Sequence, residues 1–583
     1  MLWRRVLVRH RAKLVAVVFL VVIFTHIAYI RPQKSLVSQN NSYSEQKAPV
    51  SGDKDGIKES IQRSIRDYRV FFDGLEEYKI TAPSIKGQYK DKKAPEVFST
   101  ADDILLSKEV LENVLDIPDE TYQQLKTSHS RYVDEQINKL TENYGLSTFG
   151  NILKTDPEWG TYQGSAGYVM VGGHQFSWLS YLNIRQLRST GSKLPVELFI
   201  ASDAEYEPEF CEKVLPRLNA RCNRFNPDFI KELGDRFNLG GFQFKMLAVL
   251  SSRFENVMYL DSDNLPARNP DGIFESDLYK KHQMILWPDA WARTTNPKFY
   301  EIAGIDVKPN KIRYSAYDKK EAEKAGESSV RPPSAYDFTN SNFHDFEGTI
   351  PNPTSEAGAF VINKTSHLKT LLLCLYYNVF GPDYYYPLFT QGSAGEGDKE
   401  TFIAAAHVMN EPWFQTLKQF KWVGYFRKSK GGFDSKALGH YDPVQSATDA
   451  DKDIDFMFMH LSYPKYYWSW LSDNHELYDS DEHVRMYESI YDNVGYDFDL
   501  RVLYSFTSGL CPNLFNEDGS VVVGPKEAHK NKDYMGPYLR YAQPTAQISA
   551  LCKELFIPHI KWLLETTKYP NSISPFPGSD PIA

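Results

Sequence analysis

The chain has 583 residues, of which 42% are hydrophobic and 14% aromatic, so it can bury a large core and is too apolar to be disordered. The net charge is −9, and because six basic and no acidic residues lie within positions 1–31, residues 32–583 carry −15. An acidic chain of this kind argues against nucleic acid as a partner.

The N-terminus predicts a membrane anchor. Residues 1–13 are basic, and residues 14–30 (LVAVVFLVVIFTHIAYI) form a 17-residue stretch without Asp, Glu, Lys or Arg. This length is at the short end of what spans a bilayer, and no small-residue cleavage site follows, which disfavours a cleaved signal peptide. We expect a cytosolic tail (1–13), an uncleaved single-pass type II anchor (14–30) and a luminal remainder.

A luminal chain can form disulfides and carry N-linked glycans. The sequence has five cysteines, so at least one is unpaired, and Cys211 and Cys222 are close enough along the chain to pair. No Cys/His spacing indicates zinc. Sequons at Asn40 (NNS) and Asn363 (NKT) are the predicted glycosylation sites.

Past the anchor, the sequence divides into three regions. Residues 31–55 are polar and lack periodicity, so we expect a flexible stem. Residues 56–150 repeat apolar positions at helical spacing, as in ILLSKEVLENVLDI, and predict a helical collar. Residues 151–583 then form the main luminal domain.

From Gly167 onward, short apolar runs alternate with amphipathic stretches. The segments GYVMVGG, PVELFIAS and NVMYLDSD predict strands, and HQFSWLSYLNIRQLRSTGS and GGFQFKMLAVLSSRF between them predict helices. This alternation predicts an α/β fold with a mostly parallel central sheet and helices on both faces. Ligands of such sheets bind beyond the carboxyl ends of the strands.

Two aspartates follow the third of these strands, in the stretch YLDSDN. Asp261 and Asp263 offer oxygen ligands to a hard cation, Mn²⁺ or Mg²⁺, at the edge where ligands bind. Such an ion neutralises a diphosphate and stabilises it as a leaving group. The alternative is an acidic turn, because Asp is common in turns.

A later apolar run, DFMFMHLSYPK, is interrupted by His460 and followed by Lys465. Imidazole is a ligand for Mn²⁺, and a lysine can hold a phosphate as a point charge. A histidine in an apolar run can equally be a hydrogen-bonded core residue. The aspartate pair upstream favours the interpretation of His460 as a metal ligand.

Further carboxylates and cations are candidates for the same site. The glycine-rich loop GSAGEGDKETF contains Asp398 and permits close approach of backbone to a ligand, although it could be a solvated loop. Glu356 precedes a glycine and a buried strand, so its carboxylate could face a reacting sugar. Lys245, on the helix before the aspartate strand, could reach donor phosphates, and Asp289 and Trp291 follow another strand.

The combination of the basic tail, short anchor, stem, YLDSDN, SEAGAFVINK, GEGDKETF and FMFMHLSYPK resembles the fungal Golgi α-1,2-mannosyltransferases that add branches to the mannan outer chain of N-glycans. The resemblance covers nearly the whole luminal chain. More distantly, the order of aspartate pair, acidic glycine loop and late histidine is similar to retaining GT-A transferases of the glycogenin type. A GT-A-type fold in a Golgi membrane protein is therefore implied, with residues 151–583 as the catalytic domain.

The resemblance also implies a donor, an ion and the ligands of that ion, while the roles of the other candidates rest on their own positions in the sequence. GDP-mannose would be the donor, a mannan or N-glycan chain the acceptor, and Mn²⁺ the ion, bound by Asp261, Asp263 and His460. Glu356 or Asp398 would act at the reacting sugar, as a nucleophile or by orienting acceptor hydroxyls. Lys245, Lys465 and Asp289 would bind the donor.

One departure concerns Lys465. The distant group follows its histidine with a glycine and then a lysine-proline pair, whereas here Pro464 precedes Lys465. This weakens the phosphate role of the lysine more than the metal role of His460.

Three other functions remain compatible with the sequence. The same fold could make another linkage, such as α-1,3-mannose, or use another donor, such as a UDP-sugar, because the residues of a sugar pocket are scattered. A catalytically silent glycan-binding scaffold of the secretory pathway is a second alternative, and a metal-dependent phosphatase is a third, although it needs more ligands. No Walker loop, GxSxG or HExxH motif is present.

Overall fold

The computed structural model describes residues 69–70, 72–143, 162–241, 243–514, 531 and 533–573. The predicted tail, anchor and stem, and the sequon at Asn40, lie outside these residues. Among the helices of this described part, none combines the length and apolar character needed to span a bilayer.

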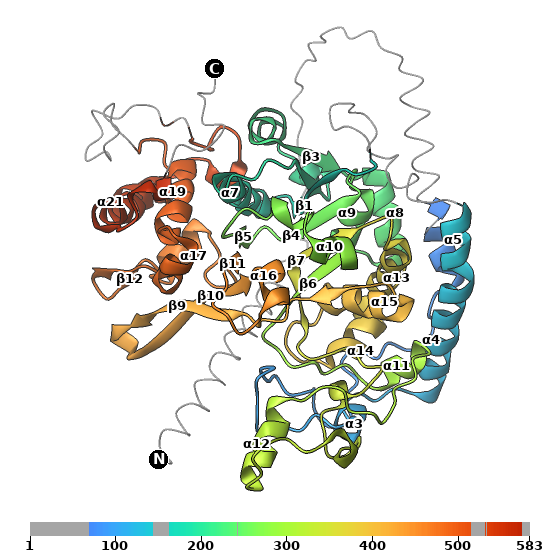
Figure 1. Cartoon of the computed structure of the whole chain (residues 1–583). Coiled ribbons are helices and arrows are strands. Elements are labelled where there is room, and N and C mark those ends of the chain that lie inside the picture. The colour runs from blue at the N-terminus through green and yellow to red at the C-terminus, as the bar shows by residue number, and fades with distance from the viewer. Residues whose placement is uncertain are drawn as a thin grey trace, which may run out of the picture. The chain divides into compact units, whose positions relative to one another are not determined.

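A seven-stranded sheet forms the centre of the fold, in the order β3-β2-β1-β4-β7-β6-β8 (Figure 1). Its strands are β1 (Ala166–Gly172), β2 (Val196–Ile200), β3 (Ala220–Arg224), β4 (Asn256–Leu260), β6 (Met284–Pro288), β7 (Ser355–Asn363) and β8 (Phe414–Gln415). β1 to β4 pair in parallel, β6 pairs with β8 in parallel, and β7 alone runs opposite to both of its neighbours. The α/β fold and the mostly parallel sheet are as predicted.

Both faces of this sheet are buried, because successive side chains of its strands enter two different cores. Tyr168 and Met170 of β1 belong to one apolar cluster, together with residues of α7 (Gln175–Ser189), and Val169 between them belongs to the other, together with residues of α9 (Gln243–Ser251). For this reason the strands are continuous apolar runs in the sequence.

We call the edge formed by the carboxyl ends of the parallel strands the ligand edge. Because β7 runs opposite to its neighbours, its first residues lie at this edge. Leu260, the last residue of β4, pairs with Ala359, so the start of β7 lies beside the end of β4. Glu356, near the first residue of β7, is thereby brought to the edge at which Asp261 leaves the sheet.

A second, four-stranded antiparallel sheet has the order β5-β11-β10-β9 and was not expected from the sequence. Its strands are β5 (Asn264–Pro266), β9 (Lys421–Arg427), β10 (Gly432–Tyr441) and β11 (Phe456–His460). β5 follows directly on the aspartate turn and pairs with β11, with Asn264 opposite His460. The pairing carries His460 to the aspartates.

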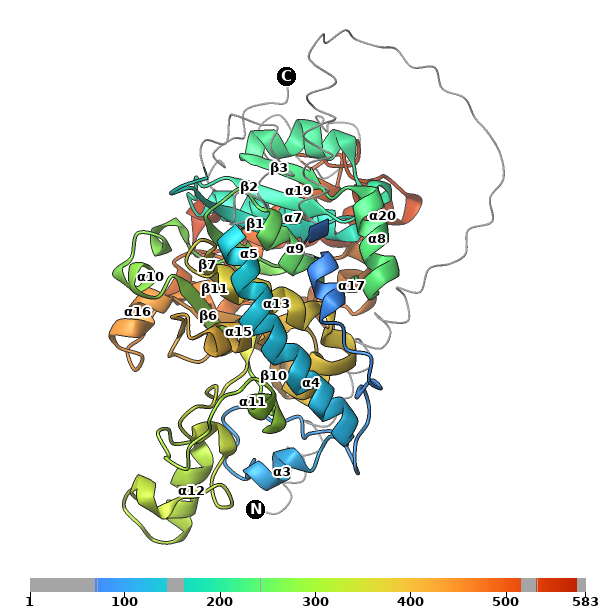
Figure 2. The same ribbon diagram turned by 90° about the vertical axis from the view of Figure 1, so that its right-hand side faces the viewer.

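The collar region packs on the outer layer of helices. α3 (Lys108–Glu112) covers only part of the stretch with helical periodicity, and α4 (Asp119–Arg131) continues through a π-helical turn into α5 (Asn138–Asn143). Figure 2 shows α4 and α5 running across α13 (Leu368–Val379), and Tyr132 stacks on Tyr376 of α13 at 4.4 Å between ring centroids. The extent of a separate collar, residues 56–150, stays a prediction.

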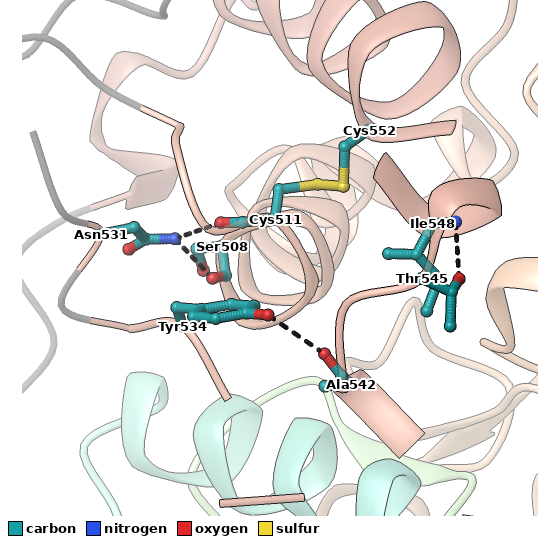
Figure 3. Close-up of a disulfide and its surroundings, with 8 residues drawn as sticks. All are labelled: Ser508, Cys511, Asn531, Tyr534, Ala542, Thr545, Ile548 and Cys552. Atoms are coloured by element: carbon teal, nitrogen blue, oxygen red, sulfur yellow. Dashed lines mark hydrogen bonds between the residues drawn. A yellow bond between two sulfur atoms is a disulfide. The ribbon is translucent and has the colours of Figure 1, made fainter. Parts of the chain in front are cut away.

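The C-terminal region is helical and joins the core beside α7. α19 (Phe498–Leu510) starts where the side chain of Asp497 accepts a hydrogen bond from the amide of Leu500, and it packs against α7 and α21 (Ile557–Thr566). Cys511 forms a disulfide with Cys552, which follows α20 (Ala546–Leu551) (Figure 3). The predicted Cys211–Cys222 disulfide is present, and Cys374 is a buried free thiol.

The remaining helices and strands surround these layers. They are α8 (Pro227–Phe237), α10 (Asp277–His282), α11 (Lys298–Ile302), α12 (Ala316–Lys324), α14 (Tyr386–Thr390), α15 (Thr401–Met409), α16 (Pro443–Thr448), α17 (Trp468–Asp473), α18 (Tyr491–Val494), β12 (Tyr478–Asp479) and β13 (Glu482–His483).

Candidate active site

The aspartate turn is held from two sides. The amide of Asp261 donates to the carbonyl of Gly358 in β7 (2.7 Å), and the side-chain amide of Asn183 in α7 donates to the carbonyl of Asp261 (2.9 Å). The turn between β4 and β5 is therefore fixed by the central sheet and by the helix that follows β1. Fixed backbone of this kind pre-organises the two carboxylates.

Asp261, whose side chain is 37% exposed, contacts the buried side chain of Lys245, which also contacts the buried Asp398. Nζ of Lys245 lies 3.3 Å from Oδ2 of Asp261 and 3.1 Å from Oδ2 of Asp398, and it donates to the carbonyl of Ala357 (2.9 Å). Burial alone would lower the pKa of Lys245, but the two carboxylates outweigh it and raise the pKa. Lys245 is thus a cation held between two carboxylates, and its predicted contact with donor phosphates stays a prediction.

Asp263 faces the opposite way, toward the second sheet. Its Oδ2 contacts the ammonium group of Lys465 and lies 3.9 Å from Nε2 of His460. Burial acts to raise the pKa of Asp263, but the charges of Lys465 and His460 outweigh it and lower the pKa. The predicted phosphate-binding lysine therefore pairs with an aspartate of the turn.

Glu356 lies between two histidines. Its Oε2 is 3.0 Å from Nδ1 of His460 and 3.7 Å from Nε2 of His440, and its Oε1 accepts a hydrogen bond from the amide of Gly358 (2.6 Å). A side chain at Gly358 would collide with Asn264, whose Nδ2 lies 1.8 Å from an added Cβ. The glycine that marked Glu356 in the sequence is therefore required by the close packing at this turn.

His440 also lies beside Glu356, and the sequence does not mark it as a candidate. It is 1% exposed, and neither ring nitrogen has a hydrogen-bond partner among the described residues. Burial lowers its pKa to about 4. Only the pairing of β10 with β11, in which Leu438 lies opposite His460, brings His440 to Glu356, so no local sequence signal marks it.

The other residues of the glycine-rich loop hold the loop in place. Lys399 donates to Asp289 (2.9 Å), which links the loop to the end of β6. Glu400 pairs with Arg293 in a fully buried contact and accepts from the amide of Ser355 (2.7 Å). Asp289, a predicted donor-binding residue, thus lies beside the start of β7 and is paired with a lysine.

The structure gathers a possible set of metal ligands that differs from the predicted one, because it includes Glu356 and His440 and neither of the two aspartates. Asp263 and His460 face each other, and the ligating atoms of Glu356, His440 and His460 all lie within 4.8 Å of one another. Carboxylate oxygens and imidazole nitrogens are suitable ligands for Mn²⁺. The ammonium group of Lys465 already contacts Asp263, which shows that the position favours positive charge. Asp261 turns its Oδ2 to Lys245 instead.

The predicted residues therefore form two neighbouring groups. Lys245, Asp261 and Asp398 make the first, and Asp263, Glu356, His460 and Lys465 make the second. Asn363 lies at the far end of β7, where its Nδ2 donates to Asn256 (2.9 Å). The roles of all these residues, and glycosylation at Asn363, stay predictions.

Part of the chain matches a known family of mannosyltransferases. A mannosyltransferase family model, Mannosyl_trans3, matches residues 165–442, which include both aspartates, Glu356 and Asp398. Among solved structures, the glycosyltransferase GlyE of Streptococcus pneumoniae overlaps 43% of this chain and 45% of its own, at 10% identity and a TM-score of 0.24.

Two curated relatives carry the name α-1,2-mannosyltransferase MNN2. The chain is 59% identical to the protein from Candida albicans, over 87% of this chain and 85% of that protein. It is 39% identical to the protein from Saccharomyces cerevisiae, over 58% of this chain and 53% of that protein. The chain is a glycosyltransferase. Within that class it belongs to the fungal α-1,2-mannosyltransferase family.

Proposed function

We propose that the chain transfers mannose from GDP-mannose to an α-mannoside acceptor of N-glycan mannan, with retention of configuration, and forms an α-1,2 linkage on a GT-A-type fold. The linkage is the one for which the similar proteins of Candida albicans and Saccharomyces cerevisiae are named. The observation that carries the rest is the contact of Asp263, Glu356 and His460 at the ligand edge of the sheet. A silent glycan-binding scaffold has no need of such a charge cluster.

The donor side of the proposed site combines a cation with two lysines. Asp263 and His460 would hold Mn²⁺, with Mg²⁺ as the alternative, and Asp261, which contacts Lys245 in this structure, is the third predicted ligand. The ion, when bound, neutralises the diphosphate and stabilises it as a leaving group. Lys465, next to Asp263, and Lys245, next to Asp261, add positive charge for the donor phosphates.

Glu356 is the proposed group at the reacting sugar. Its two oxygens are fixed by Gly358 and His460, so the carboxylate keeps one orientation. A fixed negative charge stabilises the positive charge that develops at the anomeric carbon, and the same carboxylate could act as the nucleophile. Asp398 contacts Lys245, and its proposed role is to keep that lysine protonated.

The proposed place of action rests on the N-terminal sequence and on the resemblance. The basic tail and the apolar residues 14–30 support a single-pass type II protein of the Golgi membrane with its catalytic domain in the lumen. The short apolar stretch suits a thin, early secretory membrane. The expected partners are the nucleotide-sugar donor, the glycan acceptor and the bilayer.

The decisive experiment uses the full chain in detergent with an α-mannoside acceptor. GDP-mannose and UDP-sugars compete as donors, Mn²⁺, Mg²⁺ and chelator are compared, and NMR determines the linkage of the product. Asp263→Asn removes a proposed ligand, and Asp481→Asn, at an exposed aspartate, is the matched control.

An α-1,2-mannoside made only with a divalent cation, and lost only in Asp263→Asn, is the expected result. Transfer from a UDP-sugar in place of GDP-mannose would keep the fold and refute the donor. Full activity in chelator would refute the metal. Glycan binding without any transfer would favour the scaffold.

A further inference from the structure

Three aromatic side chains gather at the surface beside the candidate site. Phe98 stacks on Trp291 with ring centroids 5.0 Å apart. Phe98 and Trp422 pack edge to face, with ring centroids 5.5 Å apart. Phe98 and Trp422 are each 38% exposed. We call Phe98, Trp291 and Trp422 the aromatic platform. Exposed apolar patches of this kind cost free energy in water and mark places where ligands bind.

The platform is built from three distant segments that the fold holds together. Phe98 and Trp291 face each other in an isolated β-bridge, and Trp422 lies on β9 of the second sheet. The carbonyl of Trp291 accepts from the amide of Thr354, two residues before Glu356. The platform is therefore anchored to the same backbone that positions the carboxylate.

Strand register connects the platform to the candidate site. Leu438 of β10 pairs with His460 of β11 on one side and with Trp422 of β9 on the other. Directly paired residues point to the same face of a sheet, so Trp422 shares a face with His460. Two strand spacings separate them, about 10 Å. A short run of linked sugar rings can span this length.

The chemistry of the platform suits a sugar chain. The C–H face of a pyranose packs on an aromatic ring, while its hydroxyls need neutral hydrogen-bonding groups nearby. Ser99 and Gln419 lie at the rim, where Oγ of Ser99 donates to Oε1 of Gln419 (3.4 Å). His440, on the same face of β10 as Leu438, has no partner for either ring nitrogen among the described residues.

We propose that the aromatic platform is an acceptor subsite. It binds a mannose residue of the α-mannoside chain beyond the residue that receives the new sugar, by stacking on Phe98 and Trp422. This proposal rests on the proposed function, because the α-mannoside acceptor is part of that function. Its consequence is that long acceptors bind more tightly than a single mannoside.

The test compares acceptor length in the full chain. Methyl α-mannoside and a linear α-mannose oligomer are assayed with wild type, Phe98→Ala, Trp422→Ala and Trp422→Phe. Phe426→Ala is the matched control, because Phe426 is 63% exposed on the same strand and lies outside the platform. Thermal unfolding of each variant reports whether it is folded.

We expect Trp422→Ala to raise KM for the oligomer roughly tenfold, with kcat and KM for methyl α-mannoside within about twofold of wild type. Phe98→Ala acts likewise, Trp422→Phe restores most of the affinity, and Phe426→Ala has no effect. An unchanged KM for the oligomer in Trp422→Ala, or equal losses for both acceptors, would overturn the subsite.

Binding of the oligomer without donor, measured by calorimetry, separates this proposal from the proposed function. If no variant transfers mannose, the function has failed, and loss of oligomer binding in Trp422→Ala still supports the platform. Oligomer binding that is equal in wild type and Trp422→Ala would refute the platform whatever the activity. Binding of wild type to phosphatidylcholine vesicles through Trp422, with oligomer binding unaffected, would assign the surface to a membrane instead.

Discussion

Nδ1 of His460 lies 3.0 Å from Oε2 of Glu356, although the two residues are 104 positions apart in the chain. The contact joins β7 of the central sheet to β11 of the second sheet. Burial alone would raise the pKa of Glu356, but His460 and His440 outweigh it and lower the pKa, so the carboxylate is held in its charged form. The candidate site therefore lies where the two sheets meet.

Replacing the charge of Glu356 tests this arrangement. We expect Glu356→Gln to lower kcat about 10²- to 10³-fold, because the amide keeps the shape of the side chain and loses the charge that we propose acts at the reacting sugar. The melting temperature and KM for the donor should change little. Glu275→Gln, at an exposed glutamate, is the control. A kcat within twofold of wild type would mean that Glu356 only supports the fold.

Lys245 offers a test of stability. It is 6% exposed and neutralises Asp261 and Asp398, so Lys245→Met leaves two carboxylates close together without their cation. Breaking a buried pair in this way costs about 3–5 kcal/mol in the free energy of unfolding, measured by urea denaturation. Lys245→Met/Asp398→Asn should recover part of the loss. If the double variant has no higher free energy of unfolding than Lys245→Met, the unpaired charge of Asp398 is not the cause of the loss.

The local parts of the fold could be predicted from the sequence. The apolar runs of β1, β2 and β4 are buried on both faces, so their residues alone identify them, and the amphipathic stretches between them form the helices. The aspartate turn could be predicted too, because two charged residues directly after a buried apolar run lie where the strand leaves the core.

The rest depends on pairings between distant segments. His440 reaches Glu356 only through the pairing of β10 with β11, and Trp422 shares their face only through β9. The reversal of β7 likewise sets which end of SEAGAFVIN meets Asp261. The position of Lys465 against Asp263, where a phosphate was expected, also follows from tertiary packing.

The two disulfides should contribute unequally to stability. Cys511 and Cys552 are 41 residues apart, and Cys211 and Cys222 are 11 apart, so closing the longer loop restricts the unfolded chain more. We expect Cys511→Ser/Cys552→Ser to lose about 4 kcal/mol and Cys211→Ser/Cys222→Ser about 3 kcal/mol of unfolding free energy. Urea denaturation without reductant measures both. Equal stability of wild type and either double variant would show that the bridge adds nothing.

His129 should make the protein sensitive to acid. It lies on α4, is 1% exposed, and its Nε2 is 2.8 Å from the hydroxyl of Tyr377. Burial lowers its pKa to about 3, from an ordinary value near 6.5. Between these two pH values the unfolded chain binds a proton that the folded chain does not, so the free energy of unfolding rises with pH and falls as the solution is acidified.

The expected loss from this one residue is about 2 kcal/mol between pH 6.5 and pH 5. His129→Gln keeps a hydrogen-bonding side chain without a titrating group, so its unfolding free energy should fall less over the same interval, as measured by urea denaturation at each pH. His475→Gln, at an exposed histidine, should behave as wild type does. Parallel pH profiles for wild type and His129→Gln would show that the imidazole is protonated in the folded protein, and that the core around Tyr377 accommodates its charge.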